Sequence, residues 1–349
     1  MPPVKVMMVD DSALVRRVIG GLLAEDPEIE LVGTASNGQE ALEKIPKLKP
    51  DVIVLDIEMP VRDGLSTLRE LMKTYPLPVV MLSSHTRPGS QATLEALALG
   101  AVDFMPKPAS TAEITAVVGE LAAKVKAAAS VSLRKILGVR QETVPQQPRK
   151  ATAPAGGRRD LVVIGCSTGG PAALQVIIPA LPADLPAAVV VVQHMPVGFT
   201  GPLSEHLARR ASLRVKHAAD GDLVLPGQVL VAPAGADFYF ENDRSGQVKV
   251  KLVARRGRPA PGVFHPSVDG VMTAAAQVRG PKVLGVLLTG MGRDGALGMK
   301  EIKKRQGRTI AEAEESCVVF GMPKAAIELG VVDKVVPLQR IAAEIVNEV

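Results

Sequence analysis

Short apolar runs alternate with amphipathic stretches through the first third of the chain, residues 4–129. In the amphipathic stretches the apolar residues recur at helical spacing, and Ser12 stands where its hydroxyl can cap the first helix. The apolar runs are short and continuous, which is typical of strands buried on both faces. The pattern predicts five strand–helix units and an α/β domain with a doubly wound parallel sheet. The expected strands are residues 4–9, 31–35, 52–55, 79–82 and 102–105.

The pattern changes at two points further along the chain. Residues 130–159 are rich in Pro, Gln, Gly and Arg and, beyond a short extension of the preceding helix, show no apolar period, which predicts a linker. From residue 160 onward, strand and helix patterns alternate again and predict a Rossmann-like, mainly parallel sheet. Within this part, residues 227–253 predict antiparallel hairpins. We therefore expect a domain at 1–129, a linker at 130–159 and a second domain at 160–349.

The composition is that of a soluble globular protein, with 47% hydrophobic and 22% charged residues in a chain of 349. Aromatic residues make up only 2%, which argues against base stacking as the main activity. Two cysteines cannot form a disulfide framework, and no secretory signal opens the chain, so we expect a cytoplasmic protein. The uncharged stretch 161–183 is interrupted by prolines and a Gly-rich segment, which excludes a membrane span.

Charge is unevenly distributed along the chain. The net charge is −4 over residues 1–129, +6 over residues 130–159 and +3 over residues 160–349. A nucleic-acid-binding domain carries its own basic face, whereas here the basic excess lies in the predicted linker. We therefore do not expect nucleic-acid binding. We also expect no membrane insertion, and we expect a monomer.

Three carboxylates follow strands that a flavodoxin-like sheet places side by side. Asp10 and Asp11 come after the first strand, and Asp56 ends the third. Ligands of doubly wound sheets bind beyond the carboxyl ends of the strands, where these side chains would converge. Each acid alone could simply cap a strand, but three uncompensated carboxylates repel one another. A hard divalent cation with oxygen ligands, most simply Mg2+, relieves that repulsion.

Two more polar residues end the next strands at the same edge. Ser83 ends the fourth strand and Lys107 follows the fifth, and a hydroxyl beside an ammonium group suits a phosphoryl group. The segments VDDS, LDIEMP with its following DG, LSS and KP occur in the order of the strands. This part of the chain resembles the receiver domain of two-component response regulators.

The receiver resemblance implies a role for each of these residues. Asp56 would accept a phosphoryl group from a histidine kinase, and Lys107 would pair with the phosphoryl oxygens. Ser83 would be the switch hydroxyl, and Phe104 stands at the position of the family's switch aromatic residue. The implied magnesium ligands are Asp10, Asp11, Asp56 and the backbone carbonyl of Glu58.

A serine-containing turn opens the second predicted domain. Residues 165–170, GCSTGG, lie between a predicted strand and a predicted helix and fit G-x-S-x-G. In that motif a tight turn exposes the serine, here Ser167, and directs following N–H groups at a developing oxyanion. A Gly-rich turn can instead hold a phosphate or a dinucleotide. The glycines do not fit G-x-G-x-x-G, and no acid ends the next strand, so we favour a serine nucleophile.

A serine nucleophile needs a base and a group that orients the base. His194 and Asp294 each follow an apolar strand, so both would reach the sheet edge where Ser167 lies. The order differs from that of α/β-hydrolases, and a lone His at a strand end is more often structural. Cys166 is a competing nucleophile, although we expect a buried thiol because neighbouring side chains point in opposite directions. His265 could line the site.

The segments IGCSTGGP, QHMP, HPSVD, LTGMGRDGA and GMPKAA resemble the catalytic domain of the chemotaxis protein-glutamate methylesterases. The resemblance implies Ser167 as nucleophile, His194 as base and Asp294 as the orienting acid. The backbone N–H of Met291 would contribute to the oxyanion hole, and Thr168 would support the histidine.

The implied reaction is hydrolysis of methyl esters on glutamate side chains of chemoreceptor cytoplasmic helices. Because an amide differs mainly in its leaving group, we expect deamidation of receptor glutamines as a second activity. We also expect the unphosphorylated receiver to cover the site around Ser167, so that phosphorylation activates the enzyme.

Two other functions fit parts of the chain. A receiver-controlled transcription factor needs a helix-turn-helix with a basic recognition helix, whereas residues 160–349 alternate strands and helices. A receiver fused to a noncatalytic adaptor, in which Ser167 is only a turn residue, is the second alternative. Labelling with a serine-directed phosphonate distinguishes the adaptor from the enzyme.

Overall fold

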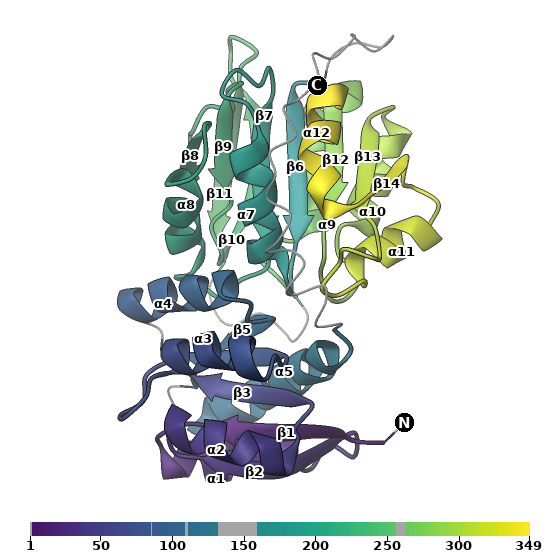
Figure 1. Cartoon of the computed structure of the whole chain (residues 1–349). Helices are drawn as coiled ribbons and strands as arrows, with labels where there is room; N and C mark the ends of the chain where they lie inside the picture. Colours follow the sequence, from purple (N-terminus) through teal and green to yellow (C-terminus); the bar gives the residue numbers. More distant parts are fainter. Residues whose placement is uncertain (1, 85, 109–110, 132–158, 256–262) are drawn as a thin grey trace. The chain divides into compact units, whose positions relative to one another are not determined.

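The computed structural model describes residues 2–84, 86–108, 111–131, 159–255 and 263–349. The chain forms two compact units, each built around its own parallel sheet (Figure 1). Most of the predicted linker lies outside the described residues, so the domain boundaries at 129 and 160 stay predictions. Both units have the α/β architecture expected from the alternating pattern.

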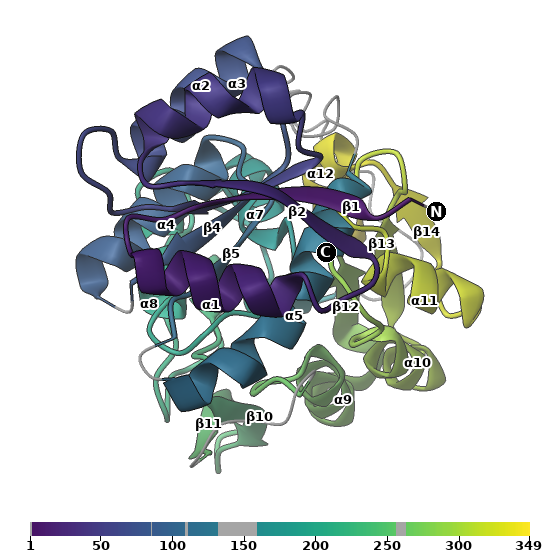
Figure 2. The ribbon, with the colours of Figure 1, turned by 90° about the horizontal axis from the view of Figure 1, so that it is seen from below.

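The first unit contains a five-stranded parallel sheet in the order β2-β1-β3-β4-β5. Its helices cover both faces, with α1 packed beside α5 on one face and α2 beside α3 on the opposite face (Figure 2). The strands are β1 (Val4–Val9), β2 (Ile29–Ala35), β3 (Val52–Asp56), β4 (Val79–Ser83) and β5 (Asp103–Pro106). The helices are α1 (Ala13–Leu23), α2 (Gly38–Leu48), α3 (Gly64–Thr74), α4 (Arg87–Ala98) and α5 (Thr111–Ala129).

Side-chain caps fix where the first helices of this unit begin. The Ser12 hydroxyl accepts a hydrogen bond from the N–H of Val15 at 3.3 Å, as the sequence predicts. Asn37 caps α2 and Asp63 caps α3 in the same way. Each cap satisfies a backbone N–H that has no partner inside its helix. The helices therefore start directly after the loops that follow the carboxyl ends of β1, β2 and β3.

The second unit contains a seven-stranded sheet in the order β14-β13-β12-β6-β7-β9-β8, parallel throughout. Its strands are β6 (Leu161–Cys166), β7 (Ala188–Gln193), β8 (Arg214–His217), β9 (Gln228–Val231), β12 (Val283–Leu287), β13 (Arg308–Glu312) and β14 (Lys334–Val336). The strands β10 (Ala236–Asn242) and β11 (Val248–Ala254) form a separate antiparallel hairpin.

The helices of the second unit are α7 (Gly170–Ala180), α8 (Thr200–Ala208), α9 (Val268–Arg279), α10 (Ala296–Lys304), α11 (Met322–Glu328) and α12 (Leu338–Glu348), with a short 3-10 helix at Gly280–Lys282. Helix α7 packs against α8 and α12, whereas α9 packs against α10 and the β10 strand. The described helices include none that is both long enough and apolar enough to cross a membrane.

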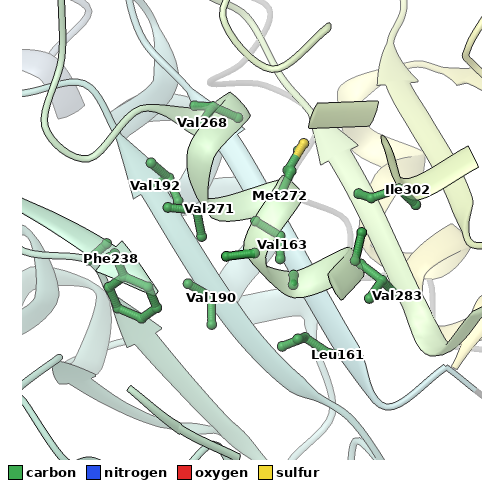
Figure 3. Close-up of a cluster of buried hydrophobic side chains, with 14 of the residues drawn as sticks. Leu161, Val163, Val190, Val192, Phe238, Val268, Val271, Met272, Val283 and Ile302 are labelled. Carbon is green, nitrogen blue, oxygen red and sulfur yellow. The ribbon is translucent and has the colours of Figure 1, made fainter. Parts of the chain in front are cut away.

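The core of the second unit forms where α9 lies over the sheet. Figure 3 shows apolar side chains of α9 facing those of the central strands, with Phe238 of the hairpin at one side. The labelled members of this cluster are Leu161, Val163, Val190, Val192, Phe238, Val268, Val271, Met272, Val283 and Ile302. Their burial holds the N-terminus of α9 close to the carboxyl ends of β6 and β12, where the predicted catalytic residues lie.

One sequence expectation for the region 227–253 is wrong in part. Residues 236–254 do form an antiparallel hairpin, but Gln228–Val231 pairs in parallel with both β7 and β8. All four residues of this strand are buried. A short buried apolar run does not indicate whether its neighbouring strands are parallel or antiparallel to it. The packing of the whole sheet decides the pairing.

Candidate active site and phosphorylation site

The predicted catalytic residues follow three adjacent strands of the seven-stranded sheet. Ser167 comes directly after β6 and His194 directly after β7, and Asp294 lies in the loop between β12 and α10. The strand β6 lies between β7 and β12, and the winding of the chain reverses between β6 and β12. Such a switch point is where open α/β sheets bind their ligands.

The turn that carries Ser167 is held by backbone contacts and close packing. The N–H of Ser167 donates to the carbonyl of Thr289 at 3.1 Å, and the Ser167 carbonyl accepts from Gly170 at 2.8 Å. A Cβ atom on Gly165 would lie 2.2 Å from a methyl group of Val268. Glycine at position 165 therefore lets the start of α9 approach the serine turn.

His194 and Asp294 form a direct pair. The Nε2 atom of the imidazole lies 2.8 Å from Oδ2 of Asp294, and the His194 side chain is only 2% exposed. Because an ionised carboxylate only accepts hydrogen bonds, the proton of this contact lies on Nε2 of His194. Nδ1 is buried and has no hydrogen-bond partner in the described part of the chain. The same part of the chain contains no hydrogen bond between the Ser167 hydroxyl and the imidazole.

Asp294 is held by the start of α9 as well as by His194. Its Oδ2 also accepts from the N–H of Val268, and its Oδ1 accepts from the N–H of Asp269, both at 2.8 Å. Burial by itself raises the pKa of Asp294, but the hydrogen bonds from His194 and from the two backbone N–H groups outweigh burial and lower it. Asp294 is therefore an anion facing the imidazole at neutral pH.

Asp269 lies next to Asp294, and its side chain caps the other helix, α10. Its Oδ1 accepts from the backbone N–H groups of Gly295 and Gly298, at 2.8 and 2.7 Å, and so caps α10. Burial, together with the neighbouring Asp294 charge, raises the pKa of Asp269. The two acids thus hold the helices α9 and α10 against one another.

Phe264 is a site residue that the sequence analysis missed. Its ring stacks on the His194 imidazole with 3.8 Å between the centroids and 5° between the planes. The neighbouring His265 contacts Asp237, with 2.7 Å between Nδ1 and Oδ1. A lone Phe in a loop gives no sequence signal for stacking, because the contact joins residues that are seventy positions apart.

The remaining predicted residues of this site differ in exposure. Cys166 is fully buried, and burial strongly raises the pKa of its thiol. A neutral buried thiol is no nucleophile, which removes the competing assignment. Thr168 is buried, whereas Met291 is exposed at the edge of the loop after β12. In the described residues the N–H of Met291 donates no hydrogen bond.

The second group of predicted residues meets at the carboxyl edge of the five-stranded sheet. Carboxylate oxygens of Asp10, Asp11 and Asp56 all lie within 4.8 Å of one another. Lys107 Nζ lies 2.6 Å from Oδ2 of Asp56 and 3.0 Å from Oδ2 of Asp10. The strands β1 and β3 are neighbours here, and the winding reverses between them, as it does at the other site.

Electrostatics at this second site favour a bound cation. Burial raises the pKa of Asp56 to about 6, and the Asp10 charge adds to the rise while Lys107 opposes it. Burial lowers the pKa of Lys107, but the pairing with both acids outweighs burial and raises it. Oδ2 of Asp10 and Oδ2 of Asp56 are buried, and in the described residues the single ammonium group of Lys107 is the charged partner of both. Buried carboxylate oxygens of this kind fit Mg2+, which takes oxygen ligands.

The predicted switch residues belong to the strands β4 and β5. Ser83 is fully buried at the end of β4, and its hydroxyl accepts from Thr93 at 2.6 Å. Phe104 is also buried, with 3% of its surface exposed. The Glu58 N–H donates to Oδ1 of Asp56 at 3.3 Å, and the Glu58 carboxylate accepts from the Ser84 hydroxyl.

Comparison with known proteins matches both halves of the chain. A family model described as CheB methylesterase matches residues 162–345, and one described as response regulator receiver domain matches residues 6–119. A protein of Carboxydothermus hydrogenoformans named protein-glutamate methylesterase/protein-glutamine glutaminase 1 is 51% identical, covering 98% of both chains. Its counterpart in Symbiobacterium thermophilum is 49% identical, covering 99% of this chain and 97% of its own.

Among solved structures, the Thermotoga maritima CheB methylesterase catalytic domain is similar with a TM-score of 0.52. It is 42% identical and covers 55% of this chain and 100% of its own. The matched regions include the serine turn, the His194–Asp294 pair and the acidic cluster. The chain therefore belongs to the CheB methylesterase family and carries a response regulator receiver domain ahead of its methylesterase domain.

Proposed function

We propose that this chain is a phosphorylation-regulated protein-glutamate methylesterase in which Ser167, His194 and Asp294 form the catalytic triad. The observation that carries the proposal is the buried His194–Asp294 pair, whose imidazole keeps Nδ1 without a partner in the described residues. The substrates are methyl esters on glutamate side chains of chemoreceptor cytoplasmic helices. Receptor glutamines are deamidated at the same site.

The reaction proceeds through an acyl-enzyme. Ser167 Oγ attacks the ester carbonyl carbon while its proton moves to Nδ1 of His194. The tetrahedral intermediate collapses as the imidazolium returns the proton to the leaving oxygen, and methanol departs. Water then attacks the acyl carbon with the same base, which releases the glutamate carboxylate and restores Ser167. Asp294 faces Nε2–H throughout and stabilises the imidazolium without taking its proton.

The loop after β12 would supply a donor to the developing oxyanion. The N–H of Met291 donates no hydrogen bond within the described residues, and it follows Gly290, which packs directly against Ser167. A Cβ atom on Gly290 would lie 2.9 Å from Cβ of Ser167. This close approach supports Met291 N–H as one donor to the oxyanion. Thr168 supports His194 from the serine turn.

In the receiver domain, Asp56 accepts the phosphoryl group from the chemotaxis histidine kinase. The Asp56 carboxylate attacks phosphorus, and the kinase histidine leaves. Mg2+ held by Asp10, Asp11, Asp56 and the Glu58 carbonyl would neutralise charge on the phosphoryl oxygens. Lys107 supplies a positive charge 2.6 Å from the accepting side chain.

Regulation follows from the separation of the two sites along the chain. Asp56 and Ser167 belong to different compact units, and in this proposal the phosphoryl group regulates the enzyme and is not a reactant in ester hydrolysis. The unphosphorylated receiver covers the Ser167 site, and rearrangement of Ser83 and Phe104 on phosphorylation loosens that contact. The enzyme acts in the cytoplasm, where both the receptor helices and the kinase are accessible.

Methanol release from methylated receptor tails tests this function directly. Ser167→Ala should lower turnover by about 10⁶-fold, the scale of a triad knockout. Ser245→Ala, in the exposed turn of the hairpin, is the matched control and should keep wild-type turnover. A serine-directed phosphonate should label Ser167 alone. Wild-type methanol release by Ser167→Ala, or no labelling of Ser167, would favour the noncatalytic adaptor.

A further inference from the structure

The Gln193 side chain lies between the two catalytic loops. Gln193 is the last residue of β7 and is only 5% exposed. Its Nε2 donates to the carbonyl of Ser167 and to the carbonyl of His194, both at 2.9 Å. Its Oε1 accepts from the Cys166 thiol at 3.0 Å. One buried carboxamide therefore joins the backbone of the serine turn to the backbone of the histidine loop.

The chemistry of these partners fixes the orientation of the carboxamide. Both backbone carbonyls only accept hydrogen bonds, and an NH2 group supplies two donors. The reversed amide would place its oxygen against two carbonyl oxygens and leave buried polar groups unpaired. Cys166 supplies the donor that the remaining amide oxygen needs.

The sheet itself stops short of Ser167 and His194. The last aligned pair of β6 and β7 is Cys166 with Gln193, and the His194 N–H makes the final backbone bond to the Cys166 carbonyl at 3.0 Å. Beyond that point the ladder no longer sets the separation of the two loops. The Gln193 amide is the next link between them.

The serine turn is shaped around this amide. A Cβ atom on Gly170 would lie 2.1 Å from Oε1 of Gln193 and 2.8 Å from Cβ of Cys166. Only glycine fits at the start of α7 while Gln193 stays in place. The turn, the thiol and the amide thus form one closely packed group behind the proposed nucleophile.

We propose that Gln193 is a positioning residue for ester hydrolysis, which fixes the spacing between Ser167 and His194 through their backbone carbonyls. This inference rests on the proposed triad. A group that only stabilised the fold would alter stability and leave turnover alone. A group that sets the geometry of nucleophile and base alters kcat and leaves KM nearly constant, because substrate binding does not involve it.

The test compares two substitutions in the full-length chain. Gln193→Met keeps the length of the side chain and removes its hydrogen bonds. We expect kcat for methanol release to fall by about 10²-fold, the scale of a small misplacement of reacting groups, with KM little changed. Gln228→Met, which also replaces a buried glutamine in the same sheet, is the matched control and should keep wild-type kcat.

Gln193→Glu supplies a readout that a structural role would not move. Its carboxylate repels the two carbonyls, whereas its protonated form donates to one of them. Burial raises the pKa of such a carboxyl, so activity relative to wild type should rise as the pH falls. This pH profile also answers the question if Gln193→Met does not fold.

The outcomes separate the two hypotheses. A wild-type protein without esterase activity overturns the proposed function. An active wild type with unchanged kcat in folded Gln193→Met overturns the role of Gln193 alone. A Glu variant whose activity relative to wild type does not change with pH also overturns that role. A fall in kcat with constant KM, together with recovery of the Glu variant at low pH, supports it.

Discussion

Asp294→Asn exchanges a single oxygen of the proposed triad for an NH2 group. The carboxylate accepts three hydrogen bonds of 2.8 Å, two on Oδ2 from His194 and Val268 and one on Oδ1 from Asp269. Asparagine offers only one acceptor oxygen. If that oxygen takes the Oδ2 position, the NH2 group faces only the N–H of Asp269. In the reverse orientation the NH2 group would face two N–H groups, those of His194 and Val268. The first orientation is favoured, and it keeps an acceptor on Nε2 of His194.

The size of the effect follows from this orientation. One partly buried N–H, that of Asp269, loses its partner, which costs about 1 kcal/mol of folding stability, the low end of the range for an unpaired buried donor. In the well-studied serine-protease triad the same exchange lowers kcat by about 10⁴-fold, because the histidine adopts the wrong tautomer. Here Nε2–H keeps an acceptor, so mainly the charge that stabilises the imidazolium is lost. We expect a loss of about 10²–10³-fold, or about 2.7–4 kcal/mol of barrier.

Steady-state methanol release at saturating substrate measures kcat, and urea unfolding measures stability. Asp269→Asn is the matched control: a single oxygen of Asp269 accepts both capping hydrogen bonds, so the amide preserves them, and turnover should stay near wild type. Wild-type kcat in Asp294→Asn would show that the carboxylate does not act on the imidazole. A loss as large as that of Ser167→Ala would show that the tautomer is not retained.

Three further predictions follow from the structure. Phe264→Leu removes a stacked ring worth about 0.5–1.5 kcal/mol and should lower kcat by about 2- to 10-fold, whereas Phe264→Tyr should keep it; equal kcat in all three proteins would refute a role for the stack. Burial raises the pKa of Asp56 in the folded state from its usual value of 3.8 to about 6. As the pH rises through this interval, Asp56 ionises more readily in the unfolded state, so the folded state loses stability until the pH exceeds the raised pKa. Without Mg2+, the advantage of Asp56→Asn in urea unfolding should therefore be small at about pH 4 and grow to about 3 kcal/mol at about pH 7.5, and an advantage independent of pH would contradict this. Deleting residues 1–150 should raise basal methanol release, and Asp56→Asn should abolish stimulation by a phosphodonor; an isolated methylesterase domain no more active than the full chain would exclude covering by the receiver.

Much of this protein is predicted by the order of its residues. Alternation of buried strands with amphipathic helices is a local property, so the two doubly wound sheets follow from the sequence pattern. Residues that directly follow such strands share one edge of the sheet, and this rule predicts the meeting of Asp10, Asp56 and Lys107. The same rule predicts that Asp294 reaches His194, which the 2.8 Å contact confirms.

Other features depend on contacts that no local pattern encodes. The strand Gln228–Val231 was expected in a hairpin, and only sheet packing makes it a parallel neighbour of β7. The sequence places Asp294 near His194, but it does not show that the backbone N–H groups at the start of α9 hold the carboxylate in place. Phe264 stacks on His194, and the Gln193 carboxamide donates to the Ser167 carbonyl, and both of these partners are distant along the chain. The sequence pattern predicts which residues stand at the strand ends. The orientation of their side chains depends on the residues packed around them, which come from distant parts of the chain.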